Sequence, residues 1–386
     1  NDTSGHEAGD IVLKTISERL KSHVRKNDTI ARISGDEFTV LLSDINSYDD
    51  ASKVTSSIIE SFQTPIRLGN TETFVTVSIG ISVTPDDSTN MDELIKNADL
   101  AMYKAKQDGR NNFRFFCQDM NVEVSRKATV ERELRGALEN KDFFLLYQPK
   151  VLFGEASIVG AEALIRWQYS DNVIKNPDYF IPVSEDTGLI IPIGRWVIKQ
   201  AISDIRRLLD LCVERIKISV NISPRQIKDS NFVVEIREVF SKVPEFIQYF
   251  EFEITENAFI DNQLGNISRL NELRDMGFSI SIDDFGTGYS SLSYLKRLPI
   301  DTIKIDRAFV QDLPNDKDSA EITNAVIAMS HKLNLAVVAE GVENVEQAQF
   351  LEAISCDIAQ GFHYGKPMSL ENLMEKFLTR VEQFNQ

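Results

Sequence analysis

The sequence predicts an α/β protein built from two blocks, the larger of which is a (β/α)8 barrel. Beyond about residue 122, short apolar stretches alternate with amphipathic ones over roughly 250 residues, which is the usual size of such a barrel. Most of these apolar stretches end in an acidic, amide or basic residue, as expected where the carboxyl ends of parallel strands meet on one face. An open, doubly wound sheet is the alternative fold.

The smaller block covers residues 1–116, in which helical and strand-like stretches alternate. The expected helices cover residues 8–24, 49–63 and 91–107, and the expected strands cover 29–33, 38–43, 73–83 and 113–117. A turn at Ser34-Gly35-Asp36 and another at Gly109-Arg110 interrupt the pattern. This order is typical of an α/β or α+β sandwich, and we assign residues 1–118 to this domain.

An amphipathic helix is predicted over residues 119–140. Val130, Leu134 and Ala137 lie on one helical stripe, and charged residues lie on the other side. The pattern favours a helical connector over a flexible linker. This helix opens the second domain, which covers residues 122–386.

The strands of the second domain are short and apolar. In the stretch "FSISID", Phe278, Ile280 and Ile282 alternate with polar residues, which is the period of a β-strand. The expected strands cover residues 157–163, 216–221, 250–254, 278–283, 302–305, 335–339 and 357–361.

The composition excludes several classes of protein. The chain has 386 residues, 42% of them hydrophobic and 26% charged, as in ordinary globular proteins. No apolar run approaches the roughly 18 residues that cross a bilayer, and no signal peptide opens the chain. The formal net charge of −17 argues against a nucleic-acid polymer as partner. Three scattered cysteines, Cys117, Cys212 and Cys356, favour a reducing, cytoplasmic compartment over a disulfide framework.

Polar residues end seven consecutive strands of the second domain. In chain order they are Glu162, Asn221, Glu253 with Glu256, Asp283 with Asp284, Lys304 with Asp306, Glu340 with Glu343, and Gln360 with Lys366. Each residue alone could be a helix cap. Because the carboxyl ends of barrel strands converge on one face, the set as a whole predicts a functional site.

The residue types at these strand ends indicate the chemistry. Several carboxylates and one amide, without His or Cys, favour Mg²⁺ or Mn²⁺. One or two such ions can bind a phosphodiester and acidify a water molecule. Lys304, which ends one of these strands, could orient that water or help to neutralise the developing charge, and Arg166 is placed to bind a phosphate oxygen. These residues predict metal-assisted phosphoester hydrolysis, and a glycosidase that uses two of the acids is the alternative.

The motifs of the second domain identify a family. "EALIRW", "VNISPRQ", "FEITE", "SIDDFGTGYSSL", "IKIDR", "VAEGVE" and "QGFHYGKP" occur in this order, and residues 122–386 closely resemble the EAL cyclic-di-GMP phosphodiesterases. The resemblance implies a modified (β/α)8, TIM-like barrel. It also implies that one or two Mg²⁺ or Mn²⁺ ions assist the opening of cyclic di-GMP to linear pGpG.

The resemblance also implies a role for each matched residue. The metal ligands would be Glu162, Asn221, Glu253, Asp283, Asp284 and Glu340, and the catalytic residues would be Lys304, Glu340, Asp284 and Glu162. The substrate would contact Gln148, Leu164, Arg166 and Gln360. Glu256 would brace the loop 285–292. Because every matched ligand position is filled, we expect turnover; a catalytically silent receptor for cyclic di-GMP is the alternative.

The first domain resembles the GGDEF, diguanylate cyclase-type domains. "NDTSGHEAGD", "RISGDEF", "VSIGIS" and "ADLAMYKAKQDGRNN" are its marks. The resemblance implies that GTP is a ligand of this domain. Its nucleotide and metal contacts would be Asn1, Asp10, Asp36, Glu37, Lys106 and Arg110, and the RxxD inhibitory site would comprise Arg25 and Asp28.

Two features set the first domain apart from that family. Ser34 stands where the first glycine of the GGDEF motif is usual, and the chain begins at Asn1, within the motif that follows the family's first strand. We therefore expect an incomplete nucleotidyl-cyclase-like domain that regulates the barrel and has no useful cyclase activity. A longer parent protein with an upstream sensor or membrane region, and a homodimer through the barrel, are further expectations from the family.

Overall fold

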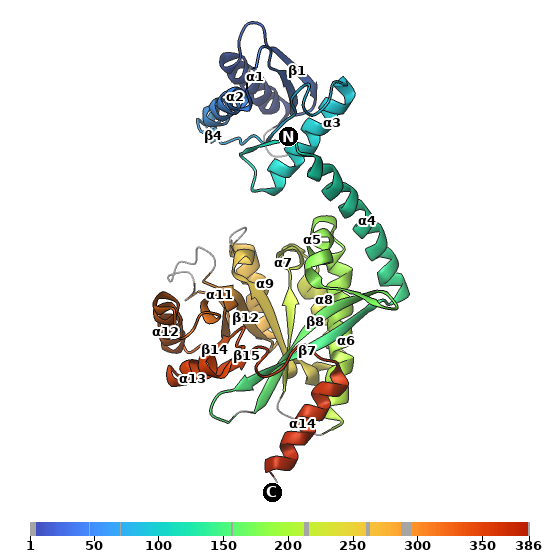
Figure 1. Ribbon diagram of the computed structural model, residues 1–386, viewed down its shortest axis with the longest axis vertical. Coiled ribbons are helices and arrows are strands. Elements are labelled where there is room, and N and C mark those ends of the chain that lie inside the picture. Colours follow the sequence, from blue (N-terminus) through green and yellow to red (C-terminus); the bar gives the residue numbers. More distant parts are fainter. Residues whose placement is uncertain are drawn as a thin grey trace. The chain divides into compact units, whose positions relative to one another are not determined.

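The computed structural model describes residues 5–45, 47–69, 71–155, 157–211, 216–259, 263–286, 295 and 297–384 (Figure 1). The chain divides into two compact units, Asn1–Ala128 and Thr129–Gln386. Within the described residues, no helix is both long and apolar enough to cross a membrane. Cys117 and Cys356 are free thiols, and Cys212 lies outside the described residues.

The first unit packs helices against short two-stranded sheets. Its described helices are α1 (Gly5–His23), α2 (Tyr48–Ser61) and α3 (Met91–Gln107). The strands pair as β1 (Thr29–Ser34) with β2 (Glu37–Leu41), β3 (Ile66–Leu68) with β4 (Thr71–Thr73), and β5 (Ile79–Ile81) with β6 (Phe113–Phe115). Ile16 and Leu20 of α1 pack in a small core with Ile58 of α2 and with Phe62, which caps α2, because the apolar residues recur every four positions. The mixed α/β character is as predicted.

The expectation of one continuous strand over residues 73–83 is wrong. Only Ile79–Ile81 of this stretch forms β5, while β4 ends at Thr73. A strand exists only where its backbone has ladder partners, and β5 pairs with β6 over these three residues alone. The alternation of apolar side chains over 73–83 indicates which side chains face inward but does not supply those partners.

The second unit is a closed barrel. Among the described residues, eight strands close through a pairing of β10 with β8, which excludes the open sheet. In sheet order they are β7 (Phe143–Leu152), β8 (Ile158–Ser170), β10 (Lys217–Ile222), β11 (Phe250–Thr255), β12 (Ser279–Phe285), β13 (Thr302–Ile305), β14 (Ala336–Ala339) and β15 (Ile358–Gln360). A short strand, β9 (Val173–Lys175), extends β8. The seven strands expected from the sequence are all present.

One barrel strand departs from the parallel pattern and was absent from the sequence-based prediction. β7 runs antiparallel to both of its neighbours, β8 and β15, whereas the other barrel pairs are parallel. It forms a hairpin with β8 instead of a strand–helix–strand unit, so the βα rhythm does not reveal it. Its alternating burial, with Phe143, Leu145 and Tyr147 buried, is nevertheless visible as an alternating pattern in the sequence.

Helices surround the barrel strands (Figure 1). They are α5 (Pro177–Thr187), α6 (Ile190–Leu209), α7 (Pro224–Lys228), α8 (Phe232–Phe240), α9 (Gln263–Asp275), α11 (Arg307–Val310), α12 (Lys317–Lys332), α13 (Val345–Ala353) and α14 (Leu370–Phe384), with short 3₁₀ helices at η1 (Pro244–Tyr249) and η2 (Glu256–Phe259). The connecting helix α4 (Gln118–Asn140) adds Val130, Leu134 and Ala137 to this unit's core.

The two faces of β11 have different chemistry. On β11, Phe250, Phe252 and Ile254 belong to the apolar core, and the Phe240 ring of α8 lies 5.0 Å from that of Phe250. The alternate residues, Glu251 and Glu253, are also buried but contact polar side chains from other strands. The inward face of β11 is therefore polar, and its outward face packs in the apolar core between the strands and the helices.

Candidate functional site

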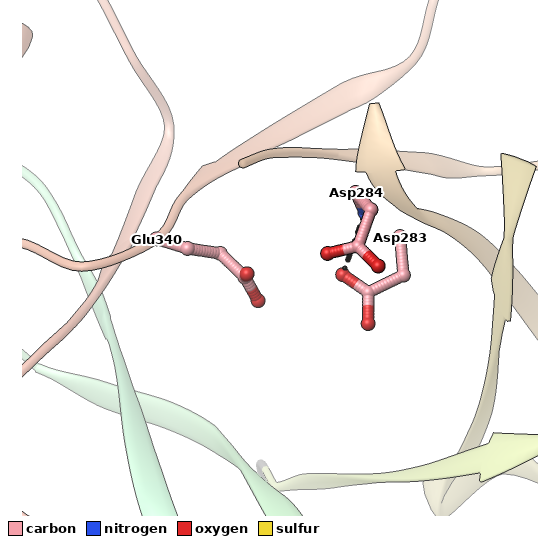
Figure 2. A group of neighbouring side chains, drawn as sticks. All are labelled: Asp283, Asp284 and Glu340. Atoms are coloured by element: carbon pink, nitrogen blue, oxygen red, sulfur yellow. Dashed lines mark hydrogen bonds between the residues drawn. The ribbon is translucent and has the colours of Figure 1, made fainter. Parts of the chain in front are cut away.

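Three carboxylates meet at the end of the barrel strands (Figure 2). Oxygen atoms of Asp283, Asp284 and Glu340 lie within 4.8 Å of one another. Adjacent residues of a regular strand face opposite sides. Here the register of β12 against β13 shifts between Ile282 and Phe285, and Asp284 has a left-handed φ of 54°. This bulge turns both aspartates toward the same point.

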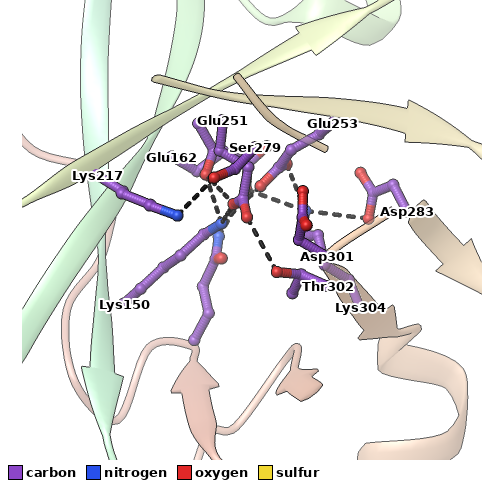
Figure 3. Close-up of polar contacts among 12 residues, drawn as sticks. Lys150, Glu162, Lys217, Glu251, Glu253, Ser279, Asp283, Asp301, Thr302 and Lys304 are labelled. Atoms are coloured by element: carbon purple, nitrogen blue, oxygen red, sulfur yellow. Dashed lines mark hydrogen bonds and ion pairs between the residues drawn. The ribbon is translucent and has the colours of Figure 1, made fainter. Parts of the chain in front are cut away.

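Lys304 lies at the centre of a larger set of carboxylates. Its ammonium nitrogen is 2.6 Å from Glu253 Oε2, 2.6 Å from Glu340 Oε1, 3.0 Å from Asp283 Oδ1 and 3.7 Å from Glu162 Oε2. The side chain is 1% exposed, and Figure 3 shows it directed toward Glu253 and Asp283. Contacts from β13 to β8 cross the barrel interior, because these strands are not neighbours in the sheet.

Glu162 is held by two amides from other strands. Asn221 Nδ2 donates to Glu162 Oε1 at 2.6 Å, and Gln360 Nε2 donates to Glu162 Oε2 at 2.6 Å. Gln360 Nε2 also lies 3.2 Å from Gln148 Oε1. The buried Gln360 Oε1 has no hydrogen-bond partner among the protein atoms described. The structure thus brings together Gln148, Glu162, Asn221 and Gln360, as the sequence predicts.

Two of the predicted substrate residues lie farther along β8. Leu164 and Arg166 follow Glu162 at intervals of two residues, and both are half-buried. Arg166 Nη1 donates to the Ile165 carbonyl at 2.9 Å, and burial lowers the pKa of Arg166 from its usual value. The Glu162 and Asp178 carboxylates oppose this decrease, so the guanidinium lies within electrostatic reach of Glu162.

The carboxyl groups of the site ionise with unequal ease. Burial raises the pKa of Glu340 to about 8 despite the adjacent Lys304, and Asp283 and Glu162 add to the rise. The pKa of Asp284 is raised to about 6 by burial and by Asp283. Burial also opposes ionisation of Glu253, but Lys150 and Lys304 outweigh it and lower its pKa to about 2. Glu340 and Asp284 thus have unfavourable anionic forms, which an added cation would stabilise.

These shifts predict how stability depends on pH. A raised carboxyl pKa means that the folded state binds more protons than the unfolded state. The stabilisation that this proton binding gives the folded state is therefore lost as the pH rises. Without divalent ions, the thermal midpoint of the barrel is expected to fall between about pH 5 and about pH 8, the window between the unfolded and folded values for Glu340. Calorimetry in EDTA would measure it. Glu340→Gln should flatten the slope, whereas a midpoint that rises across this window would contradict the prediction.

Glu256 contacts the backbone where β12 ends. Its side chain is buried, and Oε2 accepts a hydrogen bond from Gly286 N at 3.3 Å. Gly286 has a φ of 103°, and a Cβ there would lie 2.8 Å from Phe309 Cε2, so the position requires glycine. Residues 287–294 lie outside the described residues, so the brace of the loop 285–292 stays a prediction beyond Gly286.

Removing the Glu256 carboxylate is expected to weaken metal binding and turnover together. Glu256→Ala leaves Gly286 N without its acceptor next to Asp284, which shares the same turn. Calorimetric titration with Mn²⁺ and a turnover assay would measure both effects. Full activity with unchanged Mn²⁺ affinity would contradict the bracing role of Glu256.

Sequence reasoning missed one group of buried residues. Lys150 on β7 contacts Glu251 Oε2 at 3.0 Å and Glu253 Oε1 at 2.6 Å, although neither Lys150 nor Glu251 was a candidate. Glu251 precedes Glu253 by two residues, so strand alternation alone places both on the same face. Lys150 likewise follows Gln148 by two residues, which is the signal that could have revealed it.

The predicted residues of the first unit lie on helices α1 and α3, on strand β2 and in two turns. Asp10 is exposed on α1, and Lys106 and Arg110 lie at the end of α3 and in the following turn. Asp36 lies in the β1–β2 turn, and Ser34 Oγ donates to Glu37 Oε2 at 3.1 Å. Asn1 lies outside the described residues.

Two details bear on the motifs of the first unit. The left-handed φ of 49° in the β1–β2 turn belongs to Gly35, whereas Ser34 is not among the positive-φ residues, so serine fits there. The Asp28 carboxylate accepts from Arg25 N at 2.6 Å and from Ser43 N at 2.9 Å. Asp28 thus stabilises the turn before β1, and the Arg25 side chain is exposed.

Comparisons with known proteins agree with this geometry. Residues 131–367 match the family model of the EAL domain, and residues 1–112 match that of the diguanylate cyclase GGDEF domain. The chain is 39% identical over 378 residues to the cyclic di-GMP phosphodiesterase NbdA of Pseudomonas aeruginosa, covering 98% of this chain and 48% of NbdA. It is 40% identical over 374 residues to the bifunctional diguanylate cyclase/cyclic di-GMP phosphodiesterase MucR of the same organism, covering 97% of this chain and 54% of MucR.

A solved structure gives the same fold for the barrel. The PaMucR phosphodiesterase in complex with c-di-GMP is 41% identical, with a TM-score of 0.61, and the match covers 64% of this chain and 99% of that one. The chain spans about half the length of the curated relatives it matches. The family models, the closed barrel and the strand-end carboxylates together show that this chain belongs to the EAL domain family and carries a GGDEF domain before its barrel.

Proposed function

We propose that this chain hydrolyses cyclic di-GMP to linear pGpG with the help of Mg²⁺ or Mn²⁺. The observation that carries the proposal is the cluster of Asp283, Asp284 and Glu340 around the buried Lys304 at the mouth of an EAL barrel. The names of NbdA and of the PaMucR complex support the choice of cyclic di-GMP as substrate.

The donor set fits a hard divalent ion. All donors are oxygens, and the pKa values of Asp284 and Glu340 are raised, as expected for carboxylates that a cation would stabilise. Asp283, Asp284 and Glu340 would hold the metal, with Glu162, Asn221 and Glu253 as the remaining ligands that we propose. A bound ion of this kind polarises a phosphodiester and lowers the pKa of water.

The protein's own residues orient the substrate and balance its charge. We place the phosphodiester between Arg166 and Lys304, the two cations that we propose to bind it and to balance its charge. Gln148, Leu164 and Gln360 line the same end of the barrel. A water oxygen bonds to phosphorus as the P–O3′ bond breaks. The water gives up one proton and O3′ takes up one, which leaves pGpG with a 5′-phosphate and a free 3′-hydroxyl. Lys304 keeps the attacking water aligned and stabilises the added negative charge.

The first domain has a regulatory role in this proposal. Residues 1–118 would bind GTP through the guanine- and phosphate-type residues named above and act on the domain 122–386 through the helix 119–140. Association of two chains through the barrel, and action in the cytoplasm, are further parts of the proposal.

A turnover assay tests the proposed function. The purified chain with Mn²⁺ or Mg²⁺ should convert cyclic di-GMP to pGpG, as followed by chromatography. Glu162→Ala should abolish the conversion, and the matched control Glu352→Ala, an exposed carboxylate on α13, should leave it unchanged. Absence of pGpG after hours at micromolar enzyme would sink the proposal. Tight calorimetric binding of cyclic di-GMP without turnover would instead identify a silent receptor.

A further inference from the structure

A second layer of polar side chains lies inside the barrel next to the carboxylate cluster. It consists of Lys150 on β7, Ser219 on β10, Glu251 on β11 and Thr302 on β13, all of them buried. Glu251 and Thr302 precede Glu253 and Lys304 by two residues, so the same strands supply both layers. Because β7 and β11 are not neighbours in the sheet, contacts between them cross the barrel interior.

The Lys150 ammonium has three acceptors. It lies 2.6 Å from Ser219 Oγ, 3.0 Å from Glu251 Oε2 and 2.6 Å from Glu253 Oε1. Ser219 Oγ donates to Glu251 Oε2 at 2.7 Å, and Thr302 Oγ1 donates to Glu251 Oε1 at 3.1 Å. Both oxygens of Glu251 are thus satisfied within this layer, and Glu253 is the carboxylate that connects Lys150 to the site above.

Glu253 links two buried cations. Its Oε1 accepts from Lys150 and its Oε2 accepts from Lys304, each at 2.6 Å (Figure 3). Charge-assisted hydrogen bonds of this length are strong and directional. The carboxylate cannot rotate without breaking one of them, so its orientation, and with it the position of the Lys304 ammonium, depends on Lys150.

We infer that Lys150 is a positioning residue for the hydrolysis proposed above: through Glu253 it holds the Lys304 ammonium where the attacking water must be aligned. Lys150 itself touches neither the three clustered carboxylates nor the mouth of the barrel. The inference rests on the proposed function. It assigns Lys150 a role that neither the composition of the chain nor its sequence motifs indicate.

A purely structural role makes a different prediction. A lysine needed only to balance the charge of Glu251 could be removed together with that charge, since neutral replacement of a buried ion pair is often harmless or stabilising. The positioning role depends on the bond from Lys150 to Glu253 instead. The double variant Lys150→Met/Glu251→Gln separates the two roles, because it keeps the charge balance and loses that bond.

The experiment compares kinetic constants of the full chain with cyclic di-GMP and Mn²⁺. In the double variant, kcat and kcat/KM are expected to fall equally, by about 100-fold, as for a misplaced catalytic group. Lys150→Met alone should lose at least as much, and if it fails to fold, the double variant carries the test. The matched control is Lys217→Met: Lys217 Nζ contacts Ser279 Oγ at 2.5 Å at the other end of the barrel, and this variant should keep the wild-type kcat.

Two kinetic outcomes would overturn the inference: a double variant with wild-type kcat, or one in which only KM changes. A spectroscopic readout keeps the test independent of turnover. In chain labelled with ¹⁵N-lysine, the Lys304 ammonium resonance, assigned from its loss in Lys304→Met, should shift in the double variant and stay unchanged in Lys217→Met. An unchanged Lys304 resonance would refute the link. A wild-type chain without turnover would refute the proposed function. The shift of the Lys304 resonance would still show whether Lys150 positions the Lys304 ammonium.

Discussion

Replacing Lys304 with methionine is expected to lower kcat for cyclic di-GMP by about 1000-fold, the upper end of the effect of removing one preorganised donor. Lys304 is the cation that contacts Glu253, Asp283 and Glu340 together at 3.0 Å or less. Methionine has a similar length but neither the charge nor the donors, so the attacking water would lose the group that we propose orients it. Steady-state kinetics at saturating Mn²⁺ would measure the loss.

The matched control for this variant is Lys317→Met. Lys317 lies on α12, where it is 87% exposed and pairs with Glu321 at 3.7 Å, so its removal should leave kcat unchanged. A Lys304→Met enzyme that retains more than about a tenth of wild-type kcat would show that Lys304 serves the fold and not the reaction.

Replacing Glu253 with glutamine is expected to reduce the free energy of unfolding of the barrel by about 3–5 kcal/mol, the usual cost of breaking a buried ion pair. Glu253 is 1% exposed and accepts from two ammonium groups at 2.6 Å each. Glutamine can accept from one lysine but turns its own amide hydrogens toward the other, which leaves a buried cation without a partner. Urea denaturation monitored at the barrel tryptophans, Trp167 and Trp196, would measure the change.

The control for Glu253→Gln is a surface carboxylate of the same unit. Glu371 pairs with Arg207 at 2.8 Å, with the two side chains 61% and 48% exposed, and Glu371→Gln should change the unfolding free energy by less than about 1 kcal/mol. If Glu253→Gln changed the unfolding free energy as little as this control, Lys150 and Lys304 would have to find other hydrogen-bond acceptors. That result would contradict the role of Glu253 in connecting the two lysines.

The barrel could be predicted from the sequence because the patterns that indicate it are local. Strand alternation within "FEFEITE" and "SISIDD", and the helices between such stretches, depend on residues close together in the chain. The strand-end position of Glu162, Asn221 and Asp283 followed from the same pattern. β7 was not predicted because it forms an antiparallel hairpin with β8. The barrel was predicted from the alternation of strands and helices, and in the described part of the chain no helix lies between these two strands.

The sequence by itself determined which donors are present at the strand ends, and hence the preference for an oxygen-ligated divalent ion, because residue type and strand period are local properties. Only the tertiary structure decided how those donors pair. The bulge after Ile282 turns Asp283 and Asp284 toward one point, and closure of β8 on β10 brings Lys150 and Lys304 to the two oxygens of Glu253. These contacts join strands about 50 to 100 positions apart, with separations of 103 residues for Lys150 and 51 for Lys304, and no local pattern encodes the register that sets them.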